Sequence, residues 1–248
     1  MFNAIKKTVT MNIAVIFAGG QGGRMRRYSR PKQFLEYRGK PILVYTIEVF
    51  QQHPMIDGII VVCLEDWIPY LRQQLDKYNL NKVVDVVVGG ETGQDSIFNG
   101  LECATRRYAD DTIVLIHDGV RPLVKEQTIS DCLRETRDKG NCVVCVPATE
   151  TFVVKQDDLQ YWLPERNNSL LARAPQCFML GDVMSVHRQA RQDGKHDFTD
   201  TCTMMHHYGH NFNVVIGSME NIKITTPVDF FMFRAIMDAQ ETGFVFGI

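Results

Sequence analysis

The chain alternates short apolar segments with longer amphipathic ones from residue 13 almost to its end. The short segments are rich in β-branched residues and are typical of buried strands. The longer segments carry helical spacing or helix-start signals. The predicted strands are Ile13–Phe17, Gly58–Leu64, Val83–Val88, Thr112–His117, Cys142–Pro147 and Phe212–Ile216. The predicted helices are Ile42–Gln52, Trp67–Lys77, Ser96–Tyr108, Gln127–Lys139, Leu180–Asp193, Asp200–Tyr208 and Pro227–Glu241.

Alternating strands and helices predict βαβ units. Such units build a mostly parallel, twisted sheet with helices on both faces, so we expect a Rossmann-like, three-layer α/β/α fold. No repeat or flexible linker interrupts the pattern, and residues 1–248 are therefore expected to form a single domain. Ligands of such folds bind at the carboxyl ends of the strands, near a topological switch point.

One region, residues 148–176, departs from this alternation. Two strand-like segments, Thr151–Lys155 and Gln160–Leu163, flank a polar turn and predict an inserted β-hairpin arm. A protruding hairpin has little core of its own, so a second subunit is an economical surface for it. The alternative is a hairpin that folds back onto its own domain.

Composition narrows the class of protein. The 248 residues are 45% hydrophobic and 23% charged, which is ordinary for a globular chain and excludes a disordered or collagen-like one. The formal net charge of −2 gives no reason to expect nucleic acid or an anionic membrane as a partner. Seven cysteines, an odd number, suit buried thiols in a reducing cytoplasm. No apolar run of eighteen residues is present, so no membrane span is expected.

The sharpest chemical signal is the glycine-rich segment Ala18–Met25, which directly follows the first predicted strand. It lacks the Lys-Ser/Thr of a Walker loop, and Met25 occupies the third glycine position of the dinucleotide pattern. Glycines let backbone N–H groups converge on phosphate oxygens, although a tight turn alone also explains them. A cluster of cations follows and favours phosphate binding: Arg24, Arg26, Arg27, Arg30 and Lys32.

Further motifs occur in order along the chain: AGGQGGRM (18–25), PKQF (31–34), GG (89–90), DS (95–96), HDGVRP (117–122), APQ (174–176), TD (199–200) and NIK (221–223). This ordered set, which spans the chain from residue 11 onward, resembles the sugar- and polyol-phosphate nucleotidyltransferases, particularly the methylerythritol-phosphate and ribitol-phosphate cytidylyltransferases. The resemblance implies a nucleotidyltransferase fold and transfer of CMP from CTP to a small polyol phosphate, with release of pyrophosphate and with Mg²⁺ as cofactor. Charge neutralisation and in-line positioning are the main catalytic needs of such a transfer.

The resemblance also implies roles for individual residues. Arg24 and Lys32 would stabilise charge on the α-phosphate and the departing pyrophosphate, and Lys223 completes the implied catalytic set. Ser96 is also expected to cap the helix Ser96–Tyr108. The implied nucleotide-binding residues are Ala18, Gly19, Gly20, Gly22, Arg24, Lys32, Gly89, Gly90, Glu91, Ser96, Asp118 and Gly119.

Asp118 is the implied Mg²⁺ ligand. It follows the predicted strand Thr112–His117 and should therefore stand at the carboxyl end of that strand, where a carboxylate can hold a hard cation. Taken alone, the residue fits a turn aspartate equally well.

The acceptor phosphate needs a cationic pocket of its own. The implied acceptor-binding residues are Arg121, Arg166, Thr199 and Lys223. Arg166 lies on the predicted arm, which in relatives reaches across a dimer, so a homodimer through residues 148–176 is implied. Without the resemblance, Arg121, Arg166 and Lys223 fit surface or turn charges.

A few substitutions bear on the acceptor. Gly19 and Val120 favour the ribitol branch, because the methylerythritol branch usually has alanine at both positions. Relatives commonly have arginine at Gly93 and threonine at Ala174, so this chain lacks one cation and one hydroxyl there. The predicted product is CDP-ribitol from D-ribitol 5-phosphate; the alternative acceptor is 2-C-methyl-D-erythritol 4-phosphate, of isoprenoid precursor synthesis. Ala174, Gly93 and Gly119 fit neither branch, so a different pentitol or a related sugar phosphate also stays open as acceptor.

Two alternatives from other classes stay open at this point. One is a catalytically reduced homologue that only binds nucleotide, which the retained cations and Asp118 oppose. The other is a dinucleotide-binding oxidoreductase, which the failed glycine spacing opposes.

Overall fold

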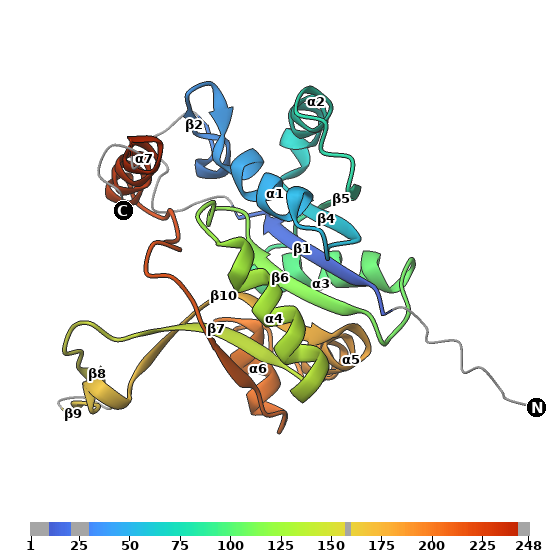
Figure 1. The fold of residues 1–248 in the computed structure, drawn as a ribbon. Helices are drawn as coiled ribbons and strands as arrows, with labels where there is room; N and C mark the ends of the chain where they lie inside the picture. The colour runs from blue at the N-terminus through green and yellow to red at the C-terminus, as the bar shows by residue number, and fades with distance from the viewer. Residues whose placement is uncertain (1–9, 21–29, 157–159, 243–248) are drawn as a thin grey trace, which may run out of the picture.

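The computed structural model describes residues 10–20, 30–156 and 160–242 (Figure 1). Its central sheet has seven strands in the order β11-β7-β10-β6-β1-β4-β5. All pairings in it are parallel except those of β10, which runs antiparallel to β6 and β7. The strands are β1 Asn12–Ala18, β4 Gly58–Cys63, β5 Val83–Val88, β6 Ile113–Asp118, β7 Cys142–Pro147, β10 Leu170–Met179 and β11 Asn213–Ile216.

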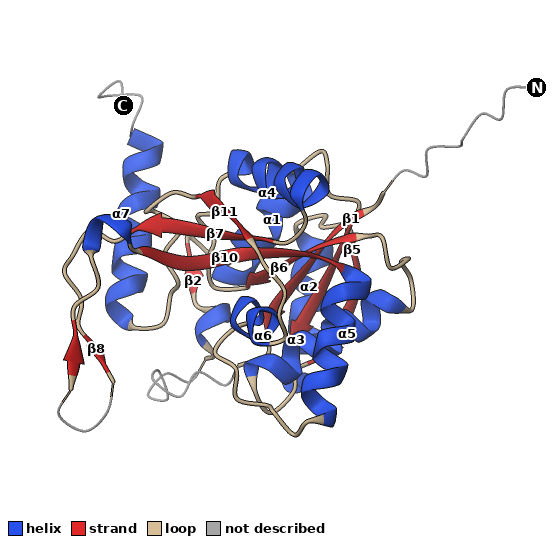
Figure 2. Cartoon of the chain, turned by 90° about the horizontal axis from the view of Figure 1, so that it is seen from below, coloured by secondary structure: helices blue, strands red, loops and turns tan. Residues whose placement is uncertain are grey.

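Helices cover both faces of the sheet (Figure 2). Apolar residues of α1, α2 and α4 pack on one face, and those of α3, α5 and α6 pack on the other. Strands buried on both faces read as nearly continuous apolar runs, which is why the sequence pattern predicted them. The helices are α1 Ile42–Gln52, α2 Ile68–Lys77, α3 Gly93–Thr105, α4 Glu126–Lys139, α5 Leu180–Gln192, α6 Thr201–His207 and α7 Pro227–Thr242.

The predicted Rossmann-like α/β architecture is confirmed, and each predicted strand and helix is present with ends shifted by a few residues. One detail is wrong: Ser96 does not cap α3. Thr92 is the N-cap, and its side chain and that of Asp95 form a reciprocal capping box. The spacing Thr-x-x-Asp is close to the capping-box pattern, and it moves the helix start three residues upstream.

The segment 148–176 divides into two parts. A small hairpin, β8 Val154–Lys155 with β9 Tyr161–Trp162, projects away from the sheet (Figure 1). The chain then returns as β10, so residues 170–176, which were predicted to belong to the arm, lie in the central sheet. Arg173 and Pro175 interrupt the apolar pattern there, and the register between β10 and β7 shifts between Arg173 and Gln176.

Two further features complete the described fold. Phe233 of α7 is fully buried against Tyr37 and Ile42, beside the small hairpin β2 Glu36–Tyr37 and β3 Lys40–Pro41. No helix in the described ranges is both long and apolar enough to cross a bilayer.

Candidate active site

The topology places a switch point at β1. Strand β1 pairs with β4 on one side and with β6 on the other, so the strands that follow β1 in the chain extend the sheet on both sides of it. Gly19 follows the end of β1, and Asp118 is the last residue of β6, in register with Phe17. Asp118 therefore stands at the carboxyl end of its strand, as predicted, at the position where such sheets bind ligands.

Two glycine segments that are far apart in sequence touch at this edge. A Cβ atom on Gly19 would lie 2.9 Å from Cα of Gly89 and 2.8 Å from Oγ of Ser96. The buried Ser96 hydroxyl accepts a hydrogen bond from the N–H of Gly90 at 3.0 Å and donates one to the carbonyl of Thr92 at 3.0 Å. Glycine is required at this contact, because any side chain would force the two loops apart.

Gln33 holds the glycine-rich segment from the other side. Its buried Nε2 donates to the carbonyls of Ala18 at 2.7 Å and Gly20 at 3.3 Å. Lys32 opens the short 3-10 turn Lys32–Phe34 that carries Gln33. The sequence motif pointed to this segment, but only the geometry reveals the structural role of Gln33.

Some predicted nucleotide-binding residues fall elsewhere. Gly22 and Arg24 lie outside the described residues. Gly90 and Glu91 line an open hollow beside Asp95 and Arg191, separate from the pocket that contains Asp118. Gly119 is buried against Leu43 and Ala18 at the end of β6.

A pocket of about 320 Å³ lies at the carboxyl ends of β1 and β6. It gathers four residues predicted from sequence: Asp118, Arg121, Thr199 and Lys223. Arg166 is not among its lining residues. The remaining lining residues come from β1, α3, β6, β10 and the start of α6, and they are Phe17, Gly93, Gln94, Ile97, Ile116, Ala172, Arg173, Ala174, Gln176, Asp200 and Thr201.

Asp118 lines this pocket and lies between two cations. Nε of Arg121 lies 2.8 Å from Oδ2, and Nζ of Lys223 lies 2.5 Å from Oδ1. Burial opposes ionisation of Asp118, but the charges of Arg121 and Lys223 outweigh it and lower its pKa to about 2. The carboxylate is therefore ionised at neutral pH and balances part of the positive charge of the pocket.

Arg121 is further fixed by backbone contacts. Its Nη1 donates to the carbonyl of Asn221 at 2.8 Å, and its own carbonyl accepts from Nε2 of His117 at 3.1 Å. A carbonyl can only accept, so this bond places the His117 proton on Nε2. Burial lowers the pKa of His117 to about 4, and the ring is neutral at physiological pH.

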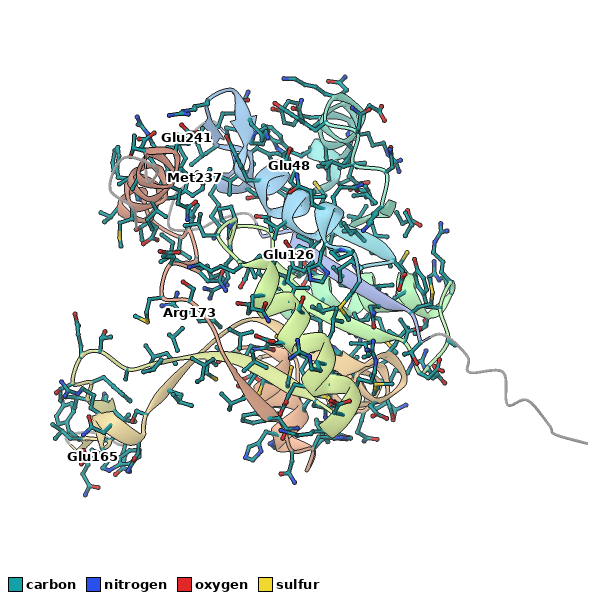
Figure 3. The ribbon with its side chains drawn as sticks, in the orientation of Figure 1. Glu48, Glu126, Glu165, Arg173, Met237 and Glu241 are labelled. Atoms are coloured by element: carbon teal, nitrogen blue, oxygen red, sulfur yellow. The ribbon has the colours of Figure 1, made fainter. Side chains whose placement is uncertain are left out.

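Arg166 lies far from this pocket within its own subunit. It begins the 3-10 turn Arg166–Asn168 on the arm and is exposed. In Figure 3 the neighbouring Glu165 lies on the projecting arm at the margin of the molecule, whereas Arg173 lies near its centre. The structure thus separates this predicted acceptor residue from the other three.

A second cluster of ligating atoms lies elsewhere. The Sγ atoms of the buried Cys132, Cys142 and Cys177 are within 4.8 Å of one another, between α4 and the sheet. Spacing in the sequence did not reveal this group, because its members come from three elements. In the described ranges no histidine or carboxylate joins them, and the thiols pack as part of the apolar core.

Comparison with known proteins identifies the family. Residues 12–239 match the family described as IspD, 2-C-methyl-D-erythritol 4-phosphate cytidylyltransferase. The chain belongs to this family. It is accordingly a nucleotidyltransferase, and the resemblance drawn from the ordered motifs is confirmed.

Relatives in the family carry two different names. A ribitol-5-phosphate cytidylyltransferase of Vibrio parahaemolyticus is 48% identical over 96% of this chain and 100% of the relative. A protein of the same name from Streptococcus agalactiae serotype III is also 48% identical, with the same coverage. A 2-C-methyl-D-erythritol 4-phosphate cytidylyltransferase of Clostridium botulinum is 36% identical over 93% of this chain and 99% of the relative.

Solved structures agree on the fold. The 2-C-methyl-D-erythritol 4-phosphate cytidylyltransferase of Francisella tularensis has a TM-score of 0.74 at 29% identity, covering 92% of this chain and 99% of that one. The 4-diphosphocytidyl-2C-methyl-D-erythritol synthase of Anaerococcus prevotii has a TM-score of 0.78 at 24% identity, covering 92% of this chain and 96% of that one.

Proposed function

We propose that this enzyme transfers CMP from CTP to D-ribitol 5-phosphate and releases pyrophosphate, forming CDP-ribitol. The observation that carries the choice of acceptor is the difference in similarity: 48% identity to relatives named for ribitol 5-phosphate against 36% to one named for methylerythritol phosphate. Gly19 and Val120, at the positions where the methylerythritol branch usually has alanine, support the same choice.

The reaction exchanges one bond to phosphorus for another. An oxygen of the acceptor phosphate forms a bond to the α-phosphorus of CTP, and the bond from that phosphorus to the bridging oxygen of the pyrophosphate group breaks. Both reactants are anions, so bringing them together requires positive charge. Arg121 and Lys223 face the pocket beside Thr199 and would bind the acceptor phosphate there. Arg24 and Lys32 would bind the nucleotide phosphates from the glycine-rich side.

The residues present fit Mg²⁺ in the manner usual for nucleotide enzymes. Asp118 offers one ionised carboxylate at the switch point, and Mg²⁺ is commonly held by one or two carboxylates together with substrate phosphates. When bound, the ion would supply positive charge between phosphate groups. Lys223, which pairs with Asp118 in this structure, would then be available to the acceptor phosphate.

We further propose that the active unit is a homodimer in the cytoplasm. The arm carries exposed apolar side chains at Tyr161, Trp162 and Leu163, which are 63%, 54% and 61% exposed, and these would pack on a second subunit. Arg166 would then reach the acceptor pocket of the partner. This placement accounts for an acceptor residue that lies outside its own pocket.

The test is pyrophosphate release from CTP with and without Mg²⁺, comparing ribitol 5-phosphate with methylerythritol 4-phosphate and with a no-acceptor blank. UTP in place of CTP checks the base. We expect the highest kcat/KM with ribitol 5-phosphate, and a Lys223→Met variant that folds normally but loses most of this rate. A preference for methylerythritol phosphate would overturn the acceptor, and release that needs no acceptor would overturn the transfer itself.

A further inference from the structure

A third cation, Arg173, lines the pocket beside Arg121 and Lys223. It was not part of any motif recognised in the sequence. Arg173 is the last residue of β10 that pairs with β7 before the register shifts. The irregularity of the strand therefore begins at this residue. Such bulges redirect side chains and are common beside active sites.

Arg173 and Arg121 donate hydrogen bonds to the same backbone carbonyl oxygen. Nη1 of Arg173 donates to the carbonyl of Asn221 at 2.7 Å, and Nη1 of Arg121 donates to the same oxygen at 2.8 Å. The two arginines differ in their charge balance, because Arg121 is paired with Asp118. Within the described part of the chain, no carboxylate forms an ion pair with Arg173.

The charges around Arg173 favour the binding of an anion. Arg173 is half-buried, and burial together with repulsion from Arg121 lowers its pKa. The other acidic residue of the pocket, Asp200, caps α6. Its Oδ1 accepts a hydrogen bond from the N–H of Thr203. An anionic ligand would therefore relieve the repulsion between the two arginines.

The pocket also has room beside another of its lining residues. Gly93 lines it, and a Cβ atom on Gly93 would meet nothing within 4 Å. The pocket that Arg173 lines therefore has space for a ligand at this position. Of its five N–H donors, only one is used by Asn221 in the described structure, and the planar fork of the others matches two oxygens of a phosphate.

From these contacts we infer that Arg173 is a further acceptor-binding residue, which holds the phosphate of the polyol phosphate together with Arg121 and Lys223. The inference rests on the proposed function for the identity of the acceptor. A purely structural role is less economical, because the carbonyl of Asn221 is also held by Arg121 and its side-chain Nδ2 donates to Ala174 at 2.7 Å.

The experiment compares Arg173→Gln and Arg173→Lys with Arg188→Gln, a matched control on the exposed surface of α5. For Arg173→Gln we expect the KM for ribitol 5-phosphate to rise about 10- to 100-fold, as for loss of a charged hydrogen bond, with the KM for CTP within about twofold. Lysine should restore part of the affinity, because it keeps the charge without the fork. The control should match the parent enzyme in all constants.

A second readout does not depend on turnover. Inorganic phosphate should bind the parent enzyme in a calorimetric titration and bind Arg173→Gln at least tenfold more weakly, while thermal unfolding shows that both are folded. An unchanged KM for the acceptor, or an equal rise in the KM for CTP, would overturn the role of Arg173 and leave the proposed reaction intact. A parent enzyme that uses no acceptor would instead overturn the proposed function, even if phosphate binding depends on Arg173.

Discussion

At the scale of single residues, the decisive arrangement is a buried carboxylate between two cations. Asp118 and Arg121 have side chains only 8% and 11% exposed, so their pair is largely removed from water, whereas Lys223 is 41% exposed. Charges in such a setting are stabilised only by their partners. The arrangement keeps Arg121 in place for a ligand and leaves Lys223 free enough to move.

Replacement of Asp118 therefore affects stability as well as activity. Asp118→Asn removes the charge that balances buried Arg121, and we expect it to lower the free energy of unfolding by about 3 kcal/mol. Cytidylyl transfer should be lost at the same time. Urea unfolding followed by circular dichroism measures the change. Asp138→Asn, on the exposed face of α4, is the control and should shift stability by less than about 0.5 kcal/mol. An Asp118→Asn variant as stable as the control would contradict the argument.

Residues at this site differ in how far sequence could predict them. Asp118 was predictable because it follows an apolar strand and lies in a recognised motif. Arg173 was not, because its place in the pocket depends on a register shift in a strand that no periodicity revealed. Gln33 lies within a motif, but its bonds to Ala18 and Gly20 depend on how two loops meet in space.

At the scale of elements, two of the three histidines buried in the described ranges lie within a strand or a helix. His117 lies on β6 and His187 on α5, and burial lowers the pKa of each from 6.5 to about 4. Between these values the unfolded chain binds more protons than the folded one. Stability is therefore full above about pH 6.5 and falls as the pH drops towards 4, by up to about 3 kcal/mol for each histidine.

The contribution of His187 can be isolated with a variant. His187→Leu removes one titrating group, so the loss of unfolding free energy between pH 7 and pH 4.5 should shrink by about 2 kcal/mol relative to the parent enzyme. Urea titrations at several pH values measure this slope. His206→Gln, at the exposed end of α6, should leave it unchanged. Parallel pH profiles for the parent enzyme and His187→Leu would show that His187 is not the cause.

The close contact between the loops that follow β1 and β5 also depends on how the elements are packed. A Cβ on Gly89 would lie 2.8 Å from Cα of Gly19, so Gly89→Ala must separate the loops that follow β1 and β5. We expect a loss of about 1–3 kcal/mol in stability and a higher KM for CTP. Gly20→Ala is the control for stability, because a Cβ there meets nothing within 4 Å. Equal unfolding midpoints for the two variants would argue against this contact.

Most elements were predictable from periodicity, because strands buried on both faces and amphipathic helices leave strong patterns. β10 escaped detection for a physical reason. Its first half is exposed near the arm, its second half is buried between β6 and β7, and the register shift separates the two. No single period describes such a strand. The predicted start of α3 is three residues too late, because the capping pair Thr92 and Asp95 has aspartate where the usual capping-box pattern has glutamate or glutamine.

At the scale of the whole molecule, the projecting hairpin of β8 and β9 does not line the pocket of its own subunit. The arm projects from the body with its apolar residues exposed, and Glu165 on the arm lies at the margin of the molecule (Figure 3). Composition and periodicity predicted the hairpin but carried no information on its contacts. In a homodimer in which each arm contacts the pocket of the other subunit, the exposed apolar residues would be covered and Arg166 would lie at a pocket. This arrangement predicts how much activity a mixture of two variants recovers.

Mixing two inactive variants tests this arrangement. Arg166→Gln removes the cation of the arm, and Lys223→Met removes a cation of the pocket. Each homodimer should therefore have low activity. A heterodimer would have one site with an intact pocket from the first variant and an intact arm from the second. If subunits mix at random, half of the dimers are heterodimers with one working site of two, so about a quarter of the parent activity should return. Activity is measured after equal amounts are mixed and left to exchange, with co-expression of the two chains where exchange is slow. If Arg166 acted within its own subunit, each heterodimer would hold only defective sites, and mixing would restore no activity.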